Sequence, residues 1–253
     1  MDRSLLLRLL DDVRSGKVAP EAAAEQIGAV PFAEVAHSVG HSLIDHHREI
    51  RTGVPEIVFG AGKTAEQIAG TLGELGKRGA AIATRVDPAK AAAVCTLLPA
   101  ARYHELARIV AIGEPSARPP AAKVCIVCAG TSDLPVAEEA ALVCEWLGAP
   151  VVRISDVGVA GLHRLLSRLE DIRACDVIIA VAGMEAALPS VLGGLTDRPM
   201  IAVPTSVGYG VSIDGLVALG ALLAGCAPGI TIVNIDNGVG AAVAATKLAR
   251  LIV

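Results

Sequence analysis

The spacing of apolar positions changes along the chain and divides it into stretches of different predicted structure. Over residues 1 to about 50, apolar side chains recur at helical spacing, as in Leu5, Leu6, Leu9, Leu10 and Val13. We predict helices here, with a break and a new start at Ala19-Pro20-Glu21. From Arg51 onward short apolar runs appear, and residues 56–59 and 80–84 are predicted strands. This region therefore predicts a small α/β layer.

The chain after residue 120 alternates strand and helix five times. The predicted strands are 124–129, 151–154, 177–182, 200–204 and 231–235, and helices follow at about 135–147, 161–173, 184–192, 213–223 and 238–251. This alternation indicates βαβ units with right-handed crossovers and a parallel, doubly wound sheet. The string Glu114-Pro-Ser-Ala-Arg-Pro-Pro120 is typical of an extended linker. We therefore predict two domains, residues 1–120 and 121–253.

Composition narrows the class of protein. Of 253 residues, 53% are hydrophobic but only 2% aromatic, so small aliphatic side chains must build the core, as in buried parallel sheets. Disorder is excluded by the apolar content, and no apolar stretch is long enough to span a membrane. Residues 121–253 carry 8 basic and 12 acidic side chains, which gives the whole net charge of −4 and argues against nucleic-acid binding.

The amino terminus and the cysteines indicate a cytoplasmic protein. The sequence MDRSLLLRLLDDVRSG has charges within its short apolar run, unlike a signal peptide. The six cysteines are therefore expected to be reduced thiols. Cys125 and Cys128 lie in a predicted strand, where residues three apart point to opposite faces. We expect core cysteines there and no zinc site.

The first half offers two candidate features. Four histidines lie close together, His37, His41, His46 and His47, and the first two are four residues apart, but H-E-x-x-H is absent. We expect them to face solvent or substrate. The turn Gly60-Ala-Gly62-Lys63-Thr64 resembles the end of a P-loop, although Ile57 stands where the first glycine is required. Its backbone N–H groups can still bind an anion, with Lys63 and Arg85 at strand ends.

In a doubly wound sheet, ligands bind beyond the carboxyl ends of the strands, and five turns lie there: residues 130–133, 155–158, 183–185, 205–210 and 234–238. No G-x-G-x-x-G is present, so a nicotinamide Rossmann site is not indicated. Ser132 or Asp133 either caps a helix or binds ligand, with equal weight. Asp156 and Glu185 could hold a metal or a ribose, or one could have a raised pKa for acid–base work.

The remaining turns add hydroxyl groups and a thiol. The turn Pro204-Thr-Ser-Val-Gly-Tyr-Gly210 resembles a phosphate or sugar cradle. Cys226 stands in Gly-Cys-Ala-Pro-Gly, a loop that we expect near the ligand-binding edge of the sheet. A thiol on such a loop can be exposed and nucleophilic. The competing interpretation is an ordinary loop cysteine.

Two of these turns resemble motifs of the PurE superfamily of purine-biosynthesis carboxylases and mutases. Gly130-Thr-Ser-Asp133 is similar to the family's G-S-x-S-D turn, and residues 182–189 are similar to A-G-G-x-A-H-L-P. Two positions depart from the family. Ala187 replaces the histidine that transfers protons, and Ser155-Asp156-Val157-Gly158 replaces Ser-Ala-His-Arg. The resemblance implies a flavodoxin-like domain that forms homo-oligomers, octamers by analogy, whereas Ala187 argues against the purine reaction.

A closer resemblance is to the LarB family, which makes the first intermediate of the nickel-pincer nucleotide cofactor. It covers nearly the whole chain from about residue 48, through residues 51–64, 84–85, 156–164, 183–190, 204–210 and 234–238. It implies a carboxylase and hydrolase that converts nicotinic acid adenine dinucleotide and CO2 or bicarbonate to pyridinium-3,5-biscarboxylic acid mononucleotide and AMP. In the family's mechanism a cysteine thiolate adds to the pyridinium ring, and the matching residue is Cys226.

The candidate residues fall into two groups under this hypothesis. The catalytic group is Cys226, Asp133 and Glu185, with a carboxylate taking the ring proton or orienting groups. The substrate-binding group is Lys63, Arg85, Ser132, Asp156, Gly183, Thr205, Ser206, Tyr209, Asn234 and Asp236. No cofactor follows from the sequence with certainty, although several carboxylates are available to hold Mg2+. The alternatives are an aminoimidazole ribonucleotide carboxylase or mutase, and a nucleotide-binding module without catalysis.

Overall fold

The computed structural model describes residues 3–28, 32–36, 41–77, 79–114 and 122–252. The chain divides into two compact units, residues 1–114 and 115–253. The predicted boundary at residue 120 lies outside the described residues. Within the described parts, no helix has both the length and the apolar character needed to cross a membrane.

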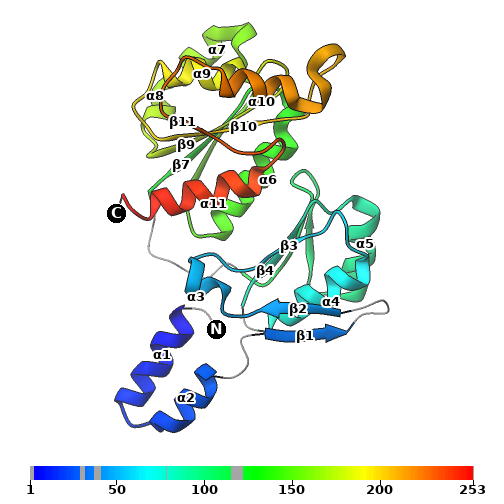
Figure 1. The fold of residues 1–253 in the computed structure, drawn as a ribbon, viewed down its shortest axis with the longest axis vertical. Helices are drawn as coiled ribbons and strands as arrows, with labels where there is room; N and C mark the ends of the chain where they lie inside the picture. Colours follow the sequence, from blue (N-terminus) through cyan, green and yellow to red (C-terminus); the bar gives the residue numbers. More distant parts are fainter. Residues whose placement is uncertain (1–2, 29–31, 37–40, 78, 115–121, 253) are drawn as a thin grey trace. The chain divides into compact units, whose positions relative to one another are not determined.

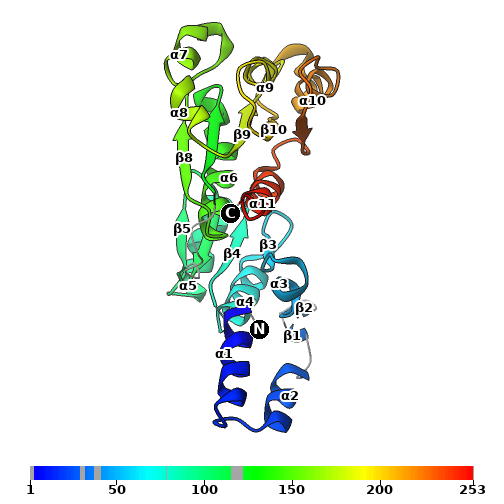
Figure 2. The ribbon, with the colours of Figure 1, turned by 90° about the vertical axis from the view of Figure 1, so that its left-hand side faces the viewer.

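The first unit begins with two helices and a hairpin. Helices α1 (Arg3–Arg14) and α2 (Pro20–Gly28) lie side by side (Figure 2). They are followed by an antiparallel pair of strands, β1 (Phe32–Ala36) and β2 (His41–Asp45), in which Ala36 lies opposite His41. The two helices and the break before Pro20 agree with the prediction, but the expectation of helical structure up to about residue 50 is wrong over these two strands.

Burial along β2 explains the error. Leu43 is exposed and Ile44 is buried, so neighbouring side chains point to opposite faces, as in a strand. Pairing with β1 supplies the backbone hydrogen bonds of β2. The spacing of apolar residues within a short stretch of sequence does not reveal such pairing with another strand. Of the histidines expected to face solvent or substrate, His37 lies outside the described residues and His41 begins a strand and is exposed. His46 is buried, so the expectation is wrong for that residue as regards solvent.

A four-stranded sheet forms the rest of this unit, in the order β3-β4-β6-β5. Strands β3 and β4 are parallel, and both β4 and β5 are antiparallel to β6. The core lies between the sheet and helices α4 and α5 and contains Val58, Ile68, Leu72, Val94 and Val110. The elements are α3 (Arg48–Thr52), β3 (Ile57–Phe59), α4 (Ala65–Gly76), β4 (Ala81–Thr84), α5 (Pro88–Leu97), β5 (Arg102–His104) and β6 (Ile109–Ile112).

The second unit is the doubly wound domain predicted from the sequence. Its five strands are all parallel and follow the flavodoxin-like order β11-β10-β9-β7-β8. The strands are β7 (Val124–Cys128), β8 (Val151–Ile154), β9 (Val177–Ala182), β10 (Met200–Pro204) and β11 (Ile230–Ile232). Every residue of β7, β9 and β10 is buried, which explains their unbroken apolar sequences.

Helices cover both faces of this sheet. Helices α6 and α11 pack against one another on one face, and α9 and α10 lie on the other (Figure 1). The helical segments are η1 (Thr131–Asp133), α6 (Leu134–Trp146), η2 (Val159–Gly161), α7 (Leu162–Ser167), α8 (Leu169–Arg173), α9 (Ala187–Gly193), η3 (Gly210–Gly215), α10 (Leu216–Leu223) and α11 (Gly238–Ala249). The helix predicted over 161–173 is split at Arg168, and the one predicted from Met184 starts at Ala187.

Candidate functional site

Asp133 is the central acidic group of the carboxyl-terminal edge of the sheet. It follows β7, at the point between β7 and β9 where the strand order reverses and where such folds bind ligands. Its side chain is buried and accepts hydrogen bonds from Thr205 Oγ1 at 2.6 Å and Gly130 N at 3.0 Å. Burial raises the pKa of Asp133, and the Thr205 hydroxyl partly offsets this increase. A proton can therefore be held here at a higher pH than on an exposed carboxyl.

Asp133 does not cap α6 in the predicted way. It occupies the N-cap position, but its carboxylate reaches back to Gly130 and across to Thr205 and makes no cap hydrogen bond to the helix. Ser132, the alternative cap, is exposed. The carboxylate thus joins the turns after β7 and β10, which are 72 residues apart.

The turn after β9 packs tightly against the turn after β10. A Cβ atom at Gly183 would lie 2.6 Å from Thr205 Oγ1, so only glycine fits. Met184 N donates a hydrogen bond to Val207 O at 2.8 Å. Met184 and Ala186 both have left-handed backbones, with φ of 55° and 48°. Glu185, between these two constrained residues, is exposed at the edge of the sheet.

The turns after β10 and β11 are tied through Asp236. Its Oδ1 accepts a hydrogen bond from Ser206 N at 2.8 Å, and its own N–H donates to Pro204 O at 2.8 Å. Asn234 is exposed, and its side chain accepts a hydrogen bond from Ile235 N. Tyr209 is 81% exposed, so its ring is free to meet a ligand.

Asp156 extends the acidic edge to β8. Its Oδ2 forms an ion pair with Arg164 Nη1 at 2.6 Å. Sequence reasoning missed Arg164, because a spacing of eight residues across a turn follows no motif. Asp156 has a left-handed backbone, with φ of 58°, and so do Asp236 and Arg85 at the ends of other strands. Such conformations are rare outside glycine and concentrate at functional sites.

Cys226 lies at the amino-terminal ends of the parallel strands, opposite to the carboxyl-terminal ends that carry these carboxylates. It follows α10, which runs back from the carboxyl edge, and precedes β11, which begins at Ile230. Its loop packs against α9, because a Cβ at Gly225 would lie 3.2 Å from Ser190 Oγ and one at Gly193 would lie 3.0 Å from Ala227 Cβ. The expectation that this thiol lies near the ligand-binding edge is therefore wrong within one chain. A loop that enters a parallel strand necessarily lies at the strands' amino ends.

Cys226 is exposed, while the predicted core cysteines Cys125 and Cys128 are buried, as are Cys144 and Cys175. Burial raises the pKa of Cys128 and of Cys144 to about 12 in each case. These thiols therefore stay protonated and unreactive in the folded chain.

In the first unit, the turns after β3 and β4 bring together the predicted cations. These strands are parallel neighbours, so Lys63 and Arg85 belong to the same edge of the sheet. Arg85 lies over the ring of Phe59, with 5.9 Å from Cζ to the centroid. Thr64 caps α4 and accepts a hydrogen bond from Gln67 N.

Lys90 is a third cation at this edge, which sequence reasoning missed. Its Nζ donates to Gly60 O and Ala61 O, each at 3.1 Å, and so ties α5 to the glycine turn. Its position three residues after Asp87, which caps α5, gave no sign of this contact. The structure therefore shows a cation-lined turn in place of a true P-loop.

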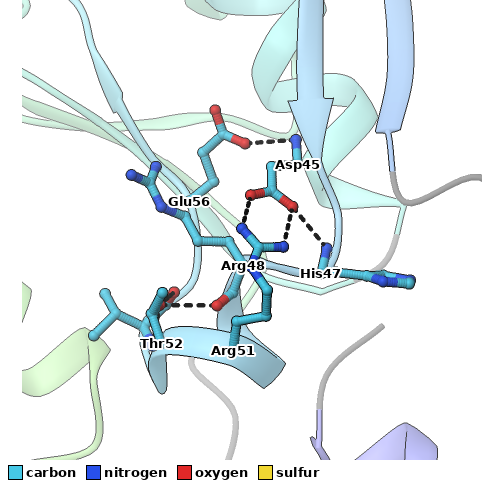
Figure 3. Close-up of polar contacts among 7 residues, drawn as sticks. Asp45, His47, Arg48, Arg51, Thr52 and Glu56 are labelled. Atoms are coloured by element: carbon cyan, nitrogen blue, oxygen red, sulfur yellow. Dashed lines mark hydrogen bonds and ion pairs between the residues drawn. The ribbon is translucent and has the colours of Figure 1, made fainter.

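A second polar cluster fixes the start of α3 (Figure 3). Asp45 accepts two hydrogen bonds from the Arg51 guanidinium, and its backbone N–H donates to Glu56 Oε2 at 2.9 Å. Arg51 is the main cause that lowers the pKa of Asp45. His47 N also donates to this carboxylate, at 3.1 Å. The cluster keeps Asp45 ionised and connects β2 to the segment entering β3.

Across the parts of the chain that the structure describes, no group of three or more His, Cys, Asp or Glu side chains converges to hold a metal ion.

Comparisons with known proteins agree with this architecture. Residues 36–114 match the family described as LarB/PurE-like N-terminal domain, and residues 123–252 match AIR carboxylase. An uncharacterized protein of Methanocaldococcus jannaschii is 39% identical over 229 residues, which cover 82% of this chain and 84% of that protein.

Two further relatives match about half of the chain. The N5-carboxyaminoimidazole ribonucleotide mutase of the same organism is 37% identical over 133 residues, 51% of this chain and 79% of that protein. The mutase of Pyrococcus horikoshii is 32% identical over 129 residues, 49% of this chain and 70% of that protein. The chain thus belongs to the LarB family, and its second unit is a PurE-like AIR carboxylase domain.

Proposed function

We propose that this protein is a pyridinium-3,5-biscarboxylic acid mononucleotide synthase. It would carboxylate the pyridinium ring of nicotinic acid adenine dinucleotide and cleave the phosphoanhydride with water, releasing AMP. The observation that carries the proposal is Cys226, which is exposed on a loop while the four cysteines in or beside the strands and helices of the same unit are buried. The family membership supplies the substrate class.

The chemistry requires a nucleophile before it requires a base. A pyridinium is electron-poor and cannot attack CO2. When the thiolate forms a sulfur–carbon bond opposite the ring nitrogen, the electron pair moves into the ring and the neighbouring carbon can bond to CO2. That carbon then gives its proton to a carboxylate base, and the sulfur–carbon bond breaks to restore the aromatic ring.

Asp133 and Glu185 are the proposed bases, and they differ in their exposure to solvent. The raised pKa of Asp133 makes its carboxylate a stronger base than an ordinary one, while Glu185 is exposed where a substrate can reach it. Lys63 and Arg85 are proposed to bind the substrate's carboxylate or phosphates, since Arg pairs with such groups in a bidentate way. Ser206, Tyr209 and the amides of the glycine turns would bind the sugar and phosphates.

The relatives named as mutases favour a second candidate, N5-carboxyaminoimidazole ribonucleotide mutase activity. Family resemblance assigns proton transfer in that reaction to a histidine, whose place at the start of α9 is taken by Ala187. A methyl group transfers no proton, so this candidate lacks its acid–base residue. Incubation with the imidazole ribonucleotide should leave it unchanged.

The direct test is mass spectrometry of the purified protein incubated with nicotinic acid adenine dinucleotide and isotopically labelled bicarbonate. We expect AMP and a mononucleotide that carries one labelled carboxylate. The Cys226→Ser variant should retain substrate binding and lose turnover. Normal turnover by this variant would refute the covalent mechanism, and absence of both products from the wild type would refute the activity.

A further inference from the structure

We propose that Lys90 is a positioning residue, which shapes the glycine turn (residues 60–63) into a site for a phosphoanhydride group without binding that group itself. Its role rests on the proposed function, in which Lys63 and Arg85 bind the substrate's phosphates. The backbone of the glycine turn takes part as well, and every contact involved lies within the first unit.

The side chain of Lys90 faces the glycine turn and is largely shielded from solvent. Lys90 belongs to α5, and its Nζ donates hydrogen bonds to Gly60 O and Ala61 O, each at 3.1 Å. Only 20% of the side chain is exposed, and Nζ also lies 3.6 Å from Asp87 Oδ2. Three oxygen atoms therefore surround the three N–H donors of the ammonium group, which leaves none of them for a ligand.

The planar trans peptide bond converts these contacts into an orientation of the next amides. In such a peptide, the C=O of one residue and the N–H of the following residue point in opposite directions. Lys90 holds the carbonyls of Gly60 and Ala61 on its own side. The N–H groups that follow them, on Ala61 and Gly62, therefore point to the opposite side of the turn. Consecutive N–H groups on one side of a turn form an anion-binding concavity.

These two N–H groups are accessible to a ligand. Ala61 and Gly62 are both exposed, and among the described residues a Cβ on Gly62 would meet nothing within 4 Å outside its chain neighbours. The amides that follow have partners, because Lys63 N donates to Gly60 O and the capping box of α4 uses the N–H groups of its N-cap and third positions. The turn thus presents amides of its own, distinct from those of the helix end.

The charge at this edge of the sheet matches a phosphoanhydride. Lys63 directly follows the two amides, and Arg85 follows β4, the parallel neighbour of β3, so both cations belong to the edge where the turn lies. Arg108 reaches the same edge from the turn before β6, since Val86 N donates to Arg108 O at 2.9 Å. Oriented amides and several cations suit a ligand with many negative oxygens, such as the phosphoanhydride of a dinucleotide.

Binding of inorganic pyrophosphate to the full chain, measured by isothermal titration calorimetry, tests this role. Lys90→Met keeps the length of the side chain but donates no hydrogen bond, so we expect its affinity for pyrophosphate to fall about tenfold or more. Lys90→Arg, which can donate to both carbonyls, should restore the affinity to within about threefold. Circular dichroism checks the fold of each variant. Equal affinity of Lys90→Met and wild type, or a wild type that does not bind pyrophosphate, would overturn the proposal.

The salt dependence separates positioning from the simple loss of a charge. A charge effect fades as the screening length falls from about 10 Å at about 0.1 M salt to about 3 Å at about 1 M. A lost orientation persists, so Lys90→Met should weaken binding by the same factor at both concentrations. Arg108→Met is the matched control, because it removes an exposed cation from this edge and leaves both carbonyl contacts of Lys90 in place. It should weaken binding by less than about threefold, and at low salt alone.

A Lys90→Met defect that disappeared at high salt would show that the lysine acts through its charge, and would refute the positioning role. Turnover assays separate this inference from the proposed function. In an active enzyme, Lys90→Met should raise KM for the dinucleotide and leave kcat near the wild-type value, because the turn holds phosphates and not the reacting ring. A pyrophosphate defect in a protein that carboxylates nothing would keep the positioning role and remove the activity. A normal KM in an active Lys90→Met would do the reverse.

Discussion

The hydrogen bond between Thr205 and Asp133 sets the stability of the carboxyl edge and its dependence on pH. Both side chains are buried, and the distance from Oγ1 to Oδ1 is 2.6 Å. Thr205→Val replaces the hydroxyl with a methyl group of similar size and opens no cavity. A hydrogen bond to a charged group contributes about 1.5–3 kcal/mol to stability, and a neutral one about 0.5–1.5 kcal/mol. Thr205→Val should therefore lower the free energy of unfolding by a larger amount when Asp133 is ionised than when it is protonated.

The direction of the pH effect follows from linkage. The pKa of Asp133 is already raised by burial, and removal of the Thr205 hydroxyl raises it further. A raised carboxyl pKa means that the folded chain keeps a proton that the unfolded chain releases. The unfolding free energy therefore falls as pH rises from the ordinary carboxyl pKa, about 4, to the raised value. We expect Thr205→Val to lose more stability than the wild type across this interval.

Urea unfolding from about pH 4 to pH 8 measures this difference. The fluorescence of Trp146, the single tryptophan, reports on α6 and hence on the second unit. Thr205→Ser, which keeps the hydroxyl, is the control and should show a loss of about 1 kcal/mol that does not change with pH. If Thr205→Val lowered the free energy of unfolding equally at every pH, the hydrogen bond between Thr205 and a titrating Asp133 would be refuted.

Two further perturbations address the turn after β9 and the reactive thiol. Gly183→Ala places a Cβ against Thr205 Oγ1 and should lower the unfolding free energy by about 1–3 kcal/mol, whereas Gly220→Ala, with open space around it, should raise it by about 0.5–1 kcal/mol. Equal stability of the two variants, measured by Trp146 fluorescence, would contradict the packing. A thiol-specific chromogenic reagent should modify Cys226 rapidly in the folded protein, and Cys125, Cys128, Cys144 and Cys175 only after denaturation. Persistence of the fast reaction in Cys226→Ser would place the reactive thiol elsewhere.

The second unit was predictable because its sequence repeats one local pattern. Each predicted strand coincides with an observed one, and the largest difference is β11, which ends at Ile232 and not at residue 235. The turns after the strands could be located, since a parallel sheet brings its carboxyl ends to one edge. The ion pair between Asp156 and Arg164 could not be predicted, because it depends on a left-handed backbone at Asp156 that no local rule requires.

Errors arose where long-range pairing decides the structure. The β1–β2 hairpin overrode an apparent helical pattern, because strand pairing is invisible in a short window. Cys226 was misplaced for a related reason: glycine and proline around it indicate a loop, but not which edge of the sheet the loop joins. Because α10 connects two parallel strands, it must run back from their carboxyl-terminal ends to their amino-terminal ends. This argument would have placed the loop of Cys226 correctly.

The packing of α6 against α11 has a consequence for synthesis of the chain. These helices cover the same face of the sheet, and Cys144 of α6 donates to Ala242 O of α11 across 98 residues of sequence. Arg250 likewise donates to Leu147 O at 3.0 Å. On the ribosome, α6 emerges long before α11 and must keep its apolar side unpaired meanwhile. A ribosomal pause before α11 would therefore lengthen the interval in which the apolar side of α6 is exposed to solvent.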